Sequence, residues 1–352
     1  MIEQKRLGDI ATYTNGFAFK PEDRGTVGLP IIRIQDLTGN AYDLGFYAGN
    51  YPERIEINDG DVLISWSASL GVYVWDKGKA LLNQHIFKVV FDKCEVNREY
   101  FVYAVRYKLK EMESKTHGAT MKHIVKKDFD NTLIPFPTLE EQENIANLLD
   151  KISTIILVRQ QQLQKLDELV KARFVELFGD MLSNDMAWQE STLDTLADVV
   201  SGITKGRKIR ETELIEVPYM AVSNVKDGYI DWTTVKTIMA TKQEIEQYRL
   251  LPYDVLMTEG GDPDKLGRGS VITKPLKNSI HQNHIFRVRL QTERILPVYF
   301  SEYLQHQKAK RYFLGCAKQT TGIASINMKQ LRALPVLVPP LKLQEQFAAF
   351  VN

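Results

Sequence analysis

Two parts of this chain repeat the same order of residues, and a long segment without proline or glycine separates them. Residues 61–89 run from Asp-Val-Leu to Asn-Gln-His-Ile-Phe-Lys-Val, and residues 254–288 run from Asp-Val-Leu to Gln-Asn-His-Ile-Phe-Arg-Val. The spacing between matching residues widens along the repeat, as small loop insertions in the second copy would produce. The duplication predicts two related domains that each bury an equivalent core.

Three further pairs of segments keep the same order in both copies: Leu7–Ala11 with Leu193–Ala197, Pro30–Ile32 with Pro218–Met220, and Pro137–Gln142 with Pro340–Gln346. A chain of 352 residues, 44% of them hydrophobic, suits two domains better than one large core. We therefore expect a first domain at residues 1–138, a central helix at 139–180, a second domain at 181–339 and the start of a distal helix at 340–352.

Each copy mixes short β-rich runs with turn signals and then continues into a helical stretch. The runs near residues 29–34, 62–65, 72–75 and 85–91 predict strands, with a helix at 99–112. The second copy repeats them near 217–222, 255–258, 270–273 and 284–290, with a helix at 298–313. Because the loops are too short for crossover helices, antiparallel or mixed sheets are expected. The predicted fold class is α+β, with two tandem mixed α/β domains and a long coiled-coil helix between them.

The central segment, residues 139–178, has apolar residues at alternating spacings of three and four, which is typical of a coiled-coil seam. Thr138 and Glu141 resemble a capping box at its start, and Gly179 is a natural stop. The seam is interrupted by Arg159 and Arg173. We expect it to pair with a second copy or a partner subunit through Ile145, Leu149, Ile152, Ile156, Leu163, Leu166, Val170 and Leu177.

Composition limits the class of protein. Cys94 and Cys316 cannot build a disulfide framework, and the N-terminal residues lack the apolar core of a signal peptide, so a cytoplasmic protein is expected. No stretch approaches the roughly 18 apolar residues needed to cross a bilayer. The net charge of +1 does not decide for or against nucleic acid, because local clusters of charge determine the potential at a binding face.

The doubled Pro-to-Gln helix start, the doubled Asn-Gln-His or Gln-Asn-His before Ile-Phe, and the duplicated order of domain and helix resemble the specificity subunit of a type I restriction-modification system. The resemblance covers the whole chain. It implies a non-catalytic subunit with two target-recognition domains, each reading one half of a split DNA sequence. It also implies that antiparallel helices hold the domains apart. Only the first turns of the distal helix are present, so we expect either a shortened chain or a helix supplied by another chain.

The same resemblance implies partners that carry out the chemistry. These are two DNA methyltransferase subunits, usually adenine-specific and dependent on S-adenosylmethionine, and restriction and translocase subunits that use ATP and magnesium. No cofactor is expected on this chain itself. The loops at residues 66–71 and 259–268 differ between the copies, whereas the shared positions are mainly apolar. Different loops on a common core predict two unlike half-sites, and hence an asymmetric target.

Candidate DNA contacts are polar side chains near strand ends and in loops. The most repeated are Asn83, Gln84 and His85 with Gln282, Asn283 and His284, although their persistence in both copies favours a scaffold role. Trp66, Tyr73 and Trp75 are more often core residues than stacking residues. The other candidates, for each of which an ordinary solvated surface is the alternative, are Arg33, Gln35, Ser67, Lys115, Thr116, Lys122, Lys205, Arg207, Lys208, Asn224, Lys226, Arg268, Lys318, Gln319 and Thr320.

Catalytic motifs are missing from the sequence. The only Pro-Pro pair, Pro339-Pro340, is followed by Leu341 rather than by the tyrosine of an amino-methyltransferase turn. No Walker phosphate loop occurs, and His281 with His284 lacks the further ligands of a zinc site. Two alternatives remain. One is a coiled-coil interaction scaffold that does not bind DNA, and the other is a degenerate enzyme with its own methyltransferase activity.

Overall fold

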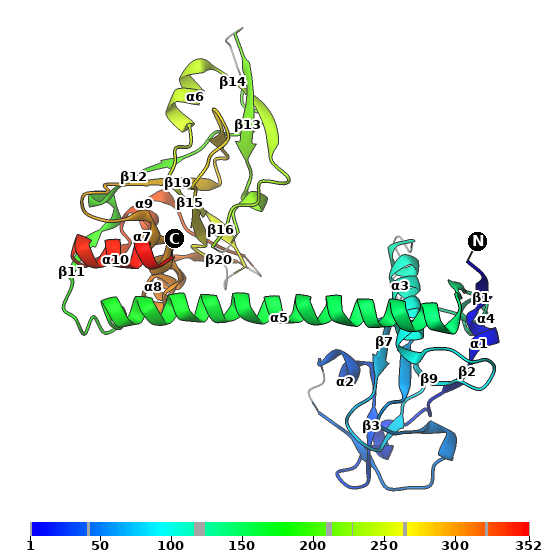
Figure 1. Cartoon of the computed structure of the whole chain (residues 1–352). Coiled ribbons are helices and arrows are strands. Elements are labelled where there is room, and N and C mark those ends of the chain that lie inside the picture. The colour runs from blue at the N-terminus through cyan, green and yellow to red at the C-terminus, as the bar shows by residue number, and fades with distance from the viewer. Residues whose placement is uncertain are drawn as a thin grey trace. The chain divides into compact units, whose positions relative to one another are not determined.

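The computed structural model describes residues 2–40, 43–115, 124–208, 213–226, 228–262, 266–320 and 323–351 (Figure 1). The chain divides into two compact units, Met1–Gln160 and Gln161–Asn352, which we call the N-terminal unit and the C-terminal unit. Short 3-10 helices lie at Pro21–Asp23, Glu53–Ile55, Leu193–Thr195 and Val222–Asn224.

An antiparallel sheet packed against a helix forms the main core of the N-terminal unit. The sheet has the order β2 (Thr12–Asn15), β9 (Ile86–Val90), β6 (Val62–Ser65), β7 (Gly71–Val74). Phe101 and Val105 of α3 (Arg98–Lys115) are buried in one cluster with Val72 and Phe87 of the sheet. Two short elements, α1 (Leu7–Ile10) and α4 (Lys126–Asp130), and the antiparallel pair β1 (Gln4–Arg6) and β10 (Leu133–Pro135) complete this core.

A second sheet of the N-terminal unit has its own buried cluster. Its order is β4 (Phe46–Tyr47), β3 (Leu29–Ile32), β8 (Ala80–Leu82), β5 (Glu56–Ile57), and β3 pairs with β8 in parallel. Helix α2 (Ile34–Thr38) follows β3. Because β8 belongs to this sheet and β9 to the first, residues 83–85 connect the two sheets.

The C-terminal unit repeats this plan. Its first sheet has the order β12 (Ala197–Ser201), β19 (Ile285–Leu290), β15 (Val255–Thr258), β17 (Gly269–Val271), and its second has the order β14 (Lys236–Ala240), β13 (Ile215–Met220), β18 (Ile280–His281). β13 and β18 are parallel, as β3 and β8 are. β11 (Gln189–Thr192) pairs with β22 (Pro335–Val338), as β1 pairs with β10.

The C-terminal unit also contains a small antiparallel sheet and several helices. The sheet has the order β16 (Gly260–Gly261), β21 (Ile323–Ser325), β20 (Lys318–Thr320). The helices are α6 (Lys242–Tyr248), α7 (Pro297–Gln305), α8 (Gln307–Cys316), α9 (Met328–Arg332) and α10 (Leu341–Val351). The predicted α+β class with mixed, mainly antiparallel sheets is confirmed.

Helix α5 (Leu139–Phe178) has the predicted bounds. Thr138 and Glu141 form the expected capping box, since the Thr138 amide donates to Glu141 Oε2 at 3.0 Å and the Glu141 amide donates to Thr138 Oγ1 at 3.3 Å. Gly179 ends the helix with a φ of +74°, a left-handed conformation that favours glycine. In the C-terminal unit, Phe174 and Phe178 of α5 contact Phe347 of α10, with ring centroids 5.3 and 5.7 Å apart.

Residues 151–169, in the middle of α5, are all exposed. Its large apolar side chains in this stretch are Ile152, Ile155, Ile156, Leu157, Val158, Leu163, Leu166 and Leu169. Soluble helices normally bury such a stripe against a neighbour. Of the residues predicted for a helix interface, Ile145 is also exposed, Leu149 is half-buried, and Val170 and Leu177 pack against the core of the C-terminal unit.

Two details of the sequence-based prediction were wrong. The helix expected at 298–313 is two helices, α7 and α8, because His306 has extended dihedral angles between them. This break lets Ala309 and Phe313 of α8 enter the main core of the C-terminal unit. The pairing of Pro137–Gln142 with Pro340–Gln346, which makes the second motif one residue longer than the first, was also wrong. Gln344, rather than Gln346, makes the hydrogen bonds that Gln142 makes in the first copy.

Candidate nucleic-acid interface

Residues 83–85 and 282–284, which we call the amide–histidine segments, are held by matching main-chain hydrogen bonds in the two units. In the N-terminal unit the Asn83 amide donates to the Ile32 carbonyl at 3.0 Å, and the Phe17 amide donates to the Leu82 carbonyl at 2.8 Å. In the C-terminal unit the Gln282 amide donates to Met220 at 3.0 Å, and the Ile203 amide donates to His281 at 2.8 Å. The backbone of each segment is therefore part of the scaffold.

A glycine lies against each amide–histidine segment. A Cβ added to Gly16 would lie 2.2 Å from the Asn83 carbonyl oxygen, and one added to Gly202 would lie 2.0 Å from that of His281. These distances are too short for any side chain. Gly16 directly follows β2 and Gly202 directly follows β12, so each segment packs tightly against the loop at the end of that strand.

The side chains of the segments are more accessible than their backbone. Gln84, His85 and His284 are exposed, while Asn83, Gln282 and Asn283 are half-buried. Gln84 Nε2 lies 3.1 Å from His85 Nε2. Amide and imidazole groups in such positions can donate and accept hydrogen bonds at base edges.

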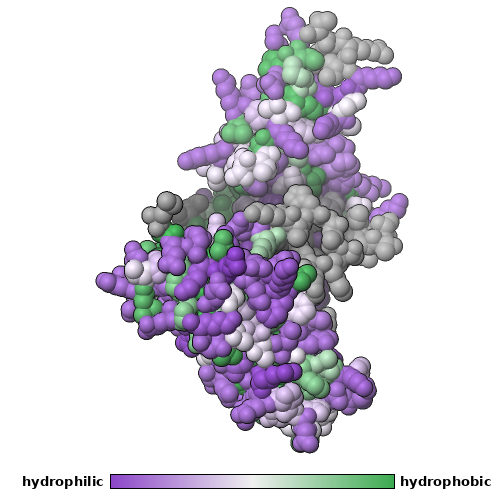
Figure 2. All heavy atoms as spheres, turned by 90° about the vertical axis from the view of Figure 1, so that its right-hand side faces the viewer, coloured by the Kyte–Doolittle hydropathy of each residue, from purple (hydrophilic) through white to green (hydrophobic). Residues whose placement is uncertain are grey.

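In the N-terminal unit a hollow of about 240 Å³ brings five predicted contact residues together. Arg33, Gln35, Asn83, Gln84 and His85 line it, along with Phe19, Arg24, Ile34 and Ile86. Arg24 was missed by sequence reasoning, because nothing in the local sequence shows that its loop returns to this site. On the face shown in Figure 2, hydrophilic residues dominate and apolar residues form small separate groups. The lining of the hollow is mixed, because Phe19, Ile34 and Ile86 lie among its polar side chains.

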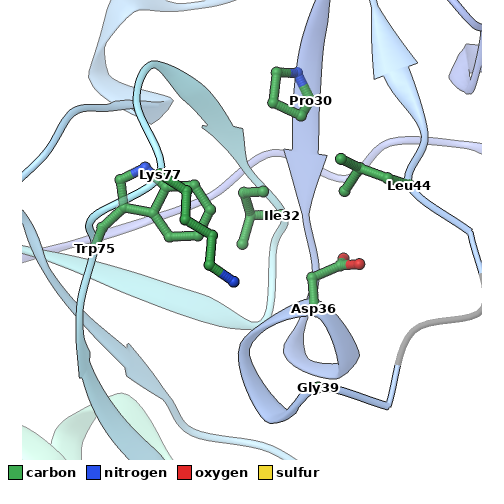
Figure 3. A pocket seen from close by; sticks show the side chains of 7 residues that line it. All are labelled: Pro30, Ile32, Asp36, Gly39, Leu44, Trp75 and Lys77. Atoms are coloured by element: carbon green, nitrogen blue, oxygen red, sulfur yellow. The ribbon is translucent and has the colours of Figure 1, made fainter.

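A second hollow of similar size in the N-terminal unit contains none of the predicted contacts. Figure 3 shows it between Pro30 and Ile32 of β3, Asp36 of α2, Trp75 and Lys77, with Gly39 and Leu44 completing the lining. Trp75 is buried in the core cluster of the second sheet, against which Tyr73 also packs. Trp75 and Tyr73 are therefore core residues, which is the interpretation that the sequence favoured.

Arg33 and Asn224 are buried at the ends of β3 and β13. Arg33 Nε donates to Asp36 Oδ2 at 3.0 Å, which raises the pKa of Arg33, and its Nη2 donates to the Asp43 carbonyl. Asn224 accepts from the Ala221 amide at 2.9 Å and donates to the Asp231 carbonyl at 3.0 Å. These partners account for the burial of both side chains and hold the loops after the two strands.

The basic loop near residue 205 contains two kinds of side chain. Lys205 and Lys208 are exposed. Arg207 forms a two-pronged ion pair with Glu244, including an Nη2 to Oε2 distance of 2.6 Å. The hydrogen bond from Arg207 lowers the pKa of Glu244, and the bond to Glu244 raises the pKa of Arg207. The two lysines are therefore better placed than Arg207 to meet a phosphate.

The remaining predicted contacts are spread over both units. Lys318 is exposed, Ser67 and Lys226 are half-buried, and the half-buried Arg268 accepts from the Thr258 amide through its carbonyl at 3.2 Å. Gln319 and Thr320 belong to β20, and Lys115 is the last residue of α3. Thr116 and Lys122 lie outside the described residues.

His281 is a core residue. It is fully buried, and its two ring nitrogens lie 3.2 Å from the Tyr248 carbonyl and 3.3 Å from the Val200 carbonyl. Burial lowers its pKa to about 4, so the ring is neutral at pH 7. Among the described residues, no group of three or more His, Cys, Asp or Glu side chains is placed to hold a metal ion, and no helix is long and apolar enough to cross a membrane.

Sequence comparison with protein families gives the same division into two copies. Residues 2–168 and 186–352 each match the family of type I restriction modification DNA specificity domains. The chain therefore belongs to this family, and its class is that of a DNA-specificity protein with two such domains. The resemblance inferred from the doubled motifs is confirmed.

Similar proteins carry the same kind of name. The type I restriction enzyme EcoBI specificity subunit of Escherichia coli is 23% identical over 98% of this chain and 77% of that protein. The EcoKI specificity subunit of E. coli K12 is 24% identical over 98% of this chain and 80% of that protein. Among solved structures, the S subunit of a type I restriction-modification system from M. genitalium matches with a TM-score of 0.60 at 16% identity, covering 100% of this chain and 88% of that chain. At 16% identity, the similarity to this solved structure shows a similar fold.

Proposed function

We propose that the two domains, residues 1–138 and 181–339, read the two halves of a split, asymmetric double-stranded DNA target. One observation supports this most directly. The same main-chain hydrogen bonds hold the amide–histidine segments in both units, while the neighbouring side chains differ. A shared scaffold with different side chains suits a protein that must contact DNA twice and distinguish two sequences.

In this proposal the exposed polar side chains contact DNA and the buried ones position them. Arg33, Arg207 and Asn224 act as supports, because Asp36, Glu244 and the Asp231 carbonyl already engage them. The half-buried Ser67, Lys226 and Arg268 remain candidates, as do Lys115, Thr116, Lys122, Gln319 and Thr320. The half-buried Asn83, Gln282 and Asn283 also remain candidates. The exposed side chains proposed to meet bases or phosphates first are Gln35, Gln84, His85, His284, Lys205, Lys208 and Lys318.

Partner subunits would supply the chemistry. The family resemblance suggests two methyltransferase subunits that use S-adenosylmethionine, and restriction subunits that use ATP and magnesium, with no cofactor on this chain. The exposed stripe of α5, residues 151–169, supports a helical partner, either a second copy or another subunit. Burying a leucine or isoleucine side chain contributes about 1.5–3 kcal/mol, so a paired stripe would be strongly stabilised. Sedimentation of the purified chain tests this, and a stable monomer at all concentrations would contradict self-pairing.

DNA binding is tested by fluorescence anisotropy of the full chain with labelled duplex at several salt concentrations. Contacts with several phosphates should make the affinity fall by orders of magnitude between about 50 and about 200 mM salt. The alternative is a coiled-coil interaction scaffold with solvated basic clusters. That alternative predicts no binding to duplex at the lower salt concentration, which would overturn the proposal.

A further inference from the structure

One position makes the same main-chain hydrogen bonds in both units, but its side chain is aromatic in one unit and acidic in the other. It follows β6 in the N-terminal unit, where it is Trp66, and β15 in the C-terminal unit, where it is Glu259. The Trp66 amide donates to the His85 carbonyl at 3.4 Å, and the Glu259 amide donates to the His284 carbonyl at 3.0 Å. Each residue therefore lies beside the histidine of an amide–histidine segment.

A second main-chain bond confirms that the two residues are equivalent. The Ile124 amide donates to the Trp66 carbonyl at 3.0 Å, and the Ile326 amide donates to the Glu259 carbonyl at 2.9 Å. The pairing of the preceding strands agrees, since Ser65 pairs with Ile86 and Thr258 with Ile285. The backbone at this position is thus set by the fold, and the side chain is free to differ without changing it.

The side chains make different contacts with the same histidine. Trp66 stacks on Phe87 at a centroid distance of 5.6 Å and meets the His85 ring edge-on at 5.3 Å. Glu259 Oε2 lies 2.6 Å from His284 Nδ1, and the two side chains are 33% and 57% exposed. A carboxylate has about four lone-pair sites, so this contact leaves it able to accept further hydrogen bonds.

A carboxylate at a DNA interface has restricted uses. It is repelled by phosphates and finds no donor on thymine O4 or on guanine O6 and N7, whereas cytosine N4 and adenine N6 donate hydrogen bonds in the major groove. An indole ring at the same position offers no acceptor and favours apolar contact. We propose that Glu259, oriented by His284, is a specificity-determining residue that accepts a hydrogen bond from an exocyclic amino group in one half-site. Its counterpart Trp66 makes an apolar contact in the other half-site.

This inference rests on the proposed reading of DNA by the two domains. Its test uses the full chain and its preferred duplex, with every base pair of both half-sites varied in turn. Glu259→Leu keeps a side chain of similar size and removes both acceptor oxygens, and Glu293→Leu removes another exposed carboxylate of the same unit as a control. Glu259→Leu should lower discrimination at one base pair of one half-site by about tenfold and leave the other half-site unchanged. Glu293→Leu should change neither.

Base analogues identify the amino group. Replacing the adenine or the cytosine at that base pair by an analogue without its exocyclic amine should weaken wild-type binding by about tenfold, and should weaken Glu259→Leu binding little, because leucine has no acceptor to lose. The analogue that has this effect tells adenine from cytosine. The inference fails if Glu259→Leu keeps the wild-type preference at every position, or if it weakens binding to all sequences equally. If the wild-type chain shows no sequence preference at all, the proposed function fails as well.

Discussion

The N-terminal and C-terminal units hold their amide–histidine segments with the same main-chain hydrogen bonds, yet only one of them has a carboxylate beside the histidine. Trp66 and Glu259 occupy equivalent positions, and so do Leu82 and His281, which end the strands β8 and β18. The difference teaches that a duplicated fold can keep its geometry through backbone contacts while its side chains diverge. The backbone of the repeated residues then belongs to the scaffold, and we propose that the unmatched residues beside them carry specificity.

The largest effect is expected where the scaffold is tightest. Gly16→Ala and Gly202→Ala would each place a Cβ about 2 Å from a carbonyl oxygen of the facing segment, so that the backbone must shift. Each variant should lower the free energy of unfolding of its own unit by roughly 2–4 kcal/mol. Chemical denaturation followed in each unit measures this. Gly315→Ala is the control, because no described atom lies within 4 Å of its added Cβ, and unchanged stability of the first two variants would contradict the shared clamp.

The next largest effect is expected at acidic pH, where His281 should lower the stability of the C-terminal unit. Burial lowers the pKa of His281 to about 4 in the folded state, whereas an unfolded histidine titrates near 6.5. The positive charge of Arg287 also lowers this pKa, and the negative charge of Asp254 raises it. The unfolded chain therefore binds more protons between these values, and stability falls as the pH drops from about 6.5 to about 4, by up to roughly 3 kcal/mol. His281→Leu, which installs the residue found at Leu82, should flatten this slope in urea titrations. Equal slopes for variant and wild type would show that His281 is not the cause.

The buried glutamines give a matched pair of smaller effects. Gln142 accepts from the Asn97 amide at 3.0 Å and donates to the Pro137 carbonyl, and Gln344 accepts from the Leu296 amide at 2.8 Å and donates to the Pro339 carbonyl. Gln142→Ala and Gln344→Ala should each cost about 1–3 kcal/mol, because a buried amide and a carbonyl lose their partner. Thermal unfolding of both variants measures the pair. A large effect in one unit alone would break the equivalence of the two helix starts.

The smallest effect concerns the basic loop, which is present in the C-terminal unit. Lys205→Ala and Lys208→Ala should weaken binding to all duplex sequences alike, and each should reduce the slope of log affinity against log salt by about one. Lys242→Ala serves as a control, because Lys242 is exposed in the same unit and pairs with Glu213 at 3.5 Å. Anisotropy titrations at several salt concentrations measure the slopes. A change in sequence preference instead would place these lysines at base edges.

The sequence predicted the features that are local in origin. The bounds of α5 followed from a stretch without proline or glycine, a capping box at Thr138 and a stop at Gly179. Strands β6 and β15 followed from the repeated Asp-Val-Leu pattern. The break at His306 was not predicted, because extended dihedral angles there depend on how α8 packs rather than on helix propensity.

The candidate site was predicted less completely, because its decisive contacts join residues that are distant in sequence. Arg207 reaches Glu244, and Glu259 reaches His284, through tertiary structure that no local pattern encodes. Arg33 sits beside Asp36 in the sequence, but its burial could not be foreseen from that spacing alone. The repeated amide–histidine motif, in contrast, was evident in the sequence, and its scaffold role could be argued from the repetition itself.

The central claim, that two equivalent scaffolds read two unlike half-sites, is tested most directly by selecting duplexes from a randomised library with the full chain and sequencing the bound fraction. The account predicts two enriched blocks of different sequence separated by a spacer of fixed length. Enrichment of a palindrome, of a single block, or of no sequence at all would contradict it.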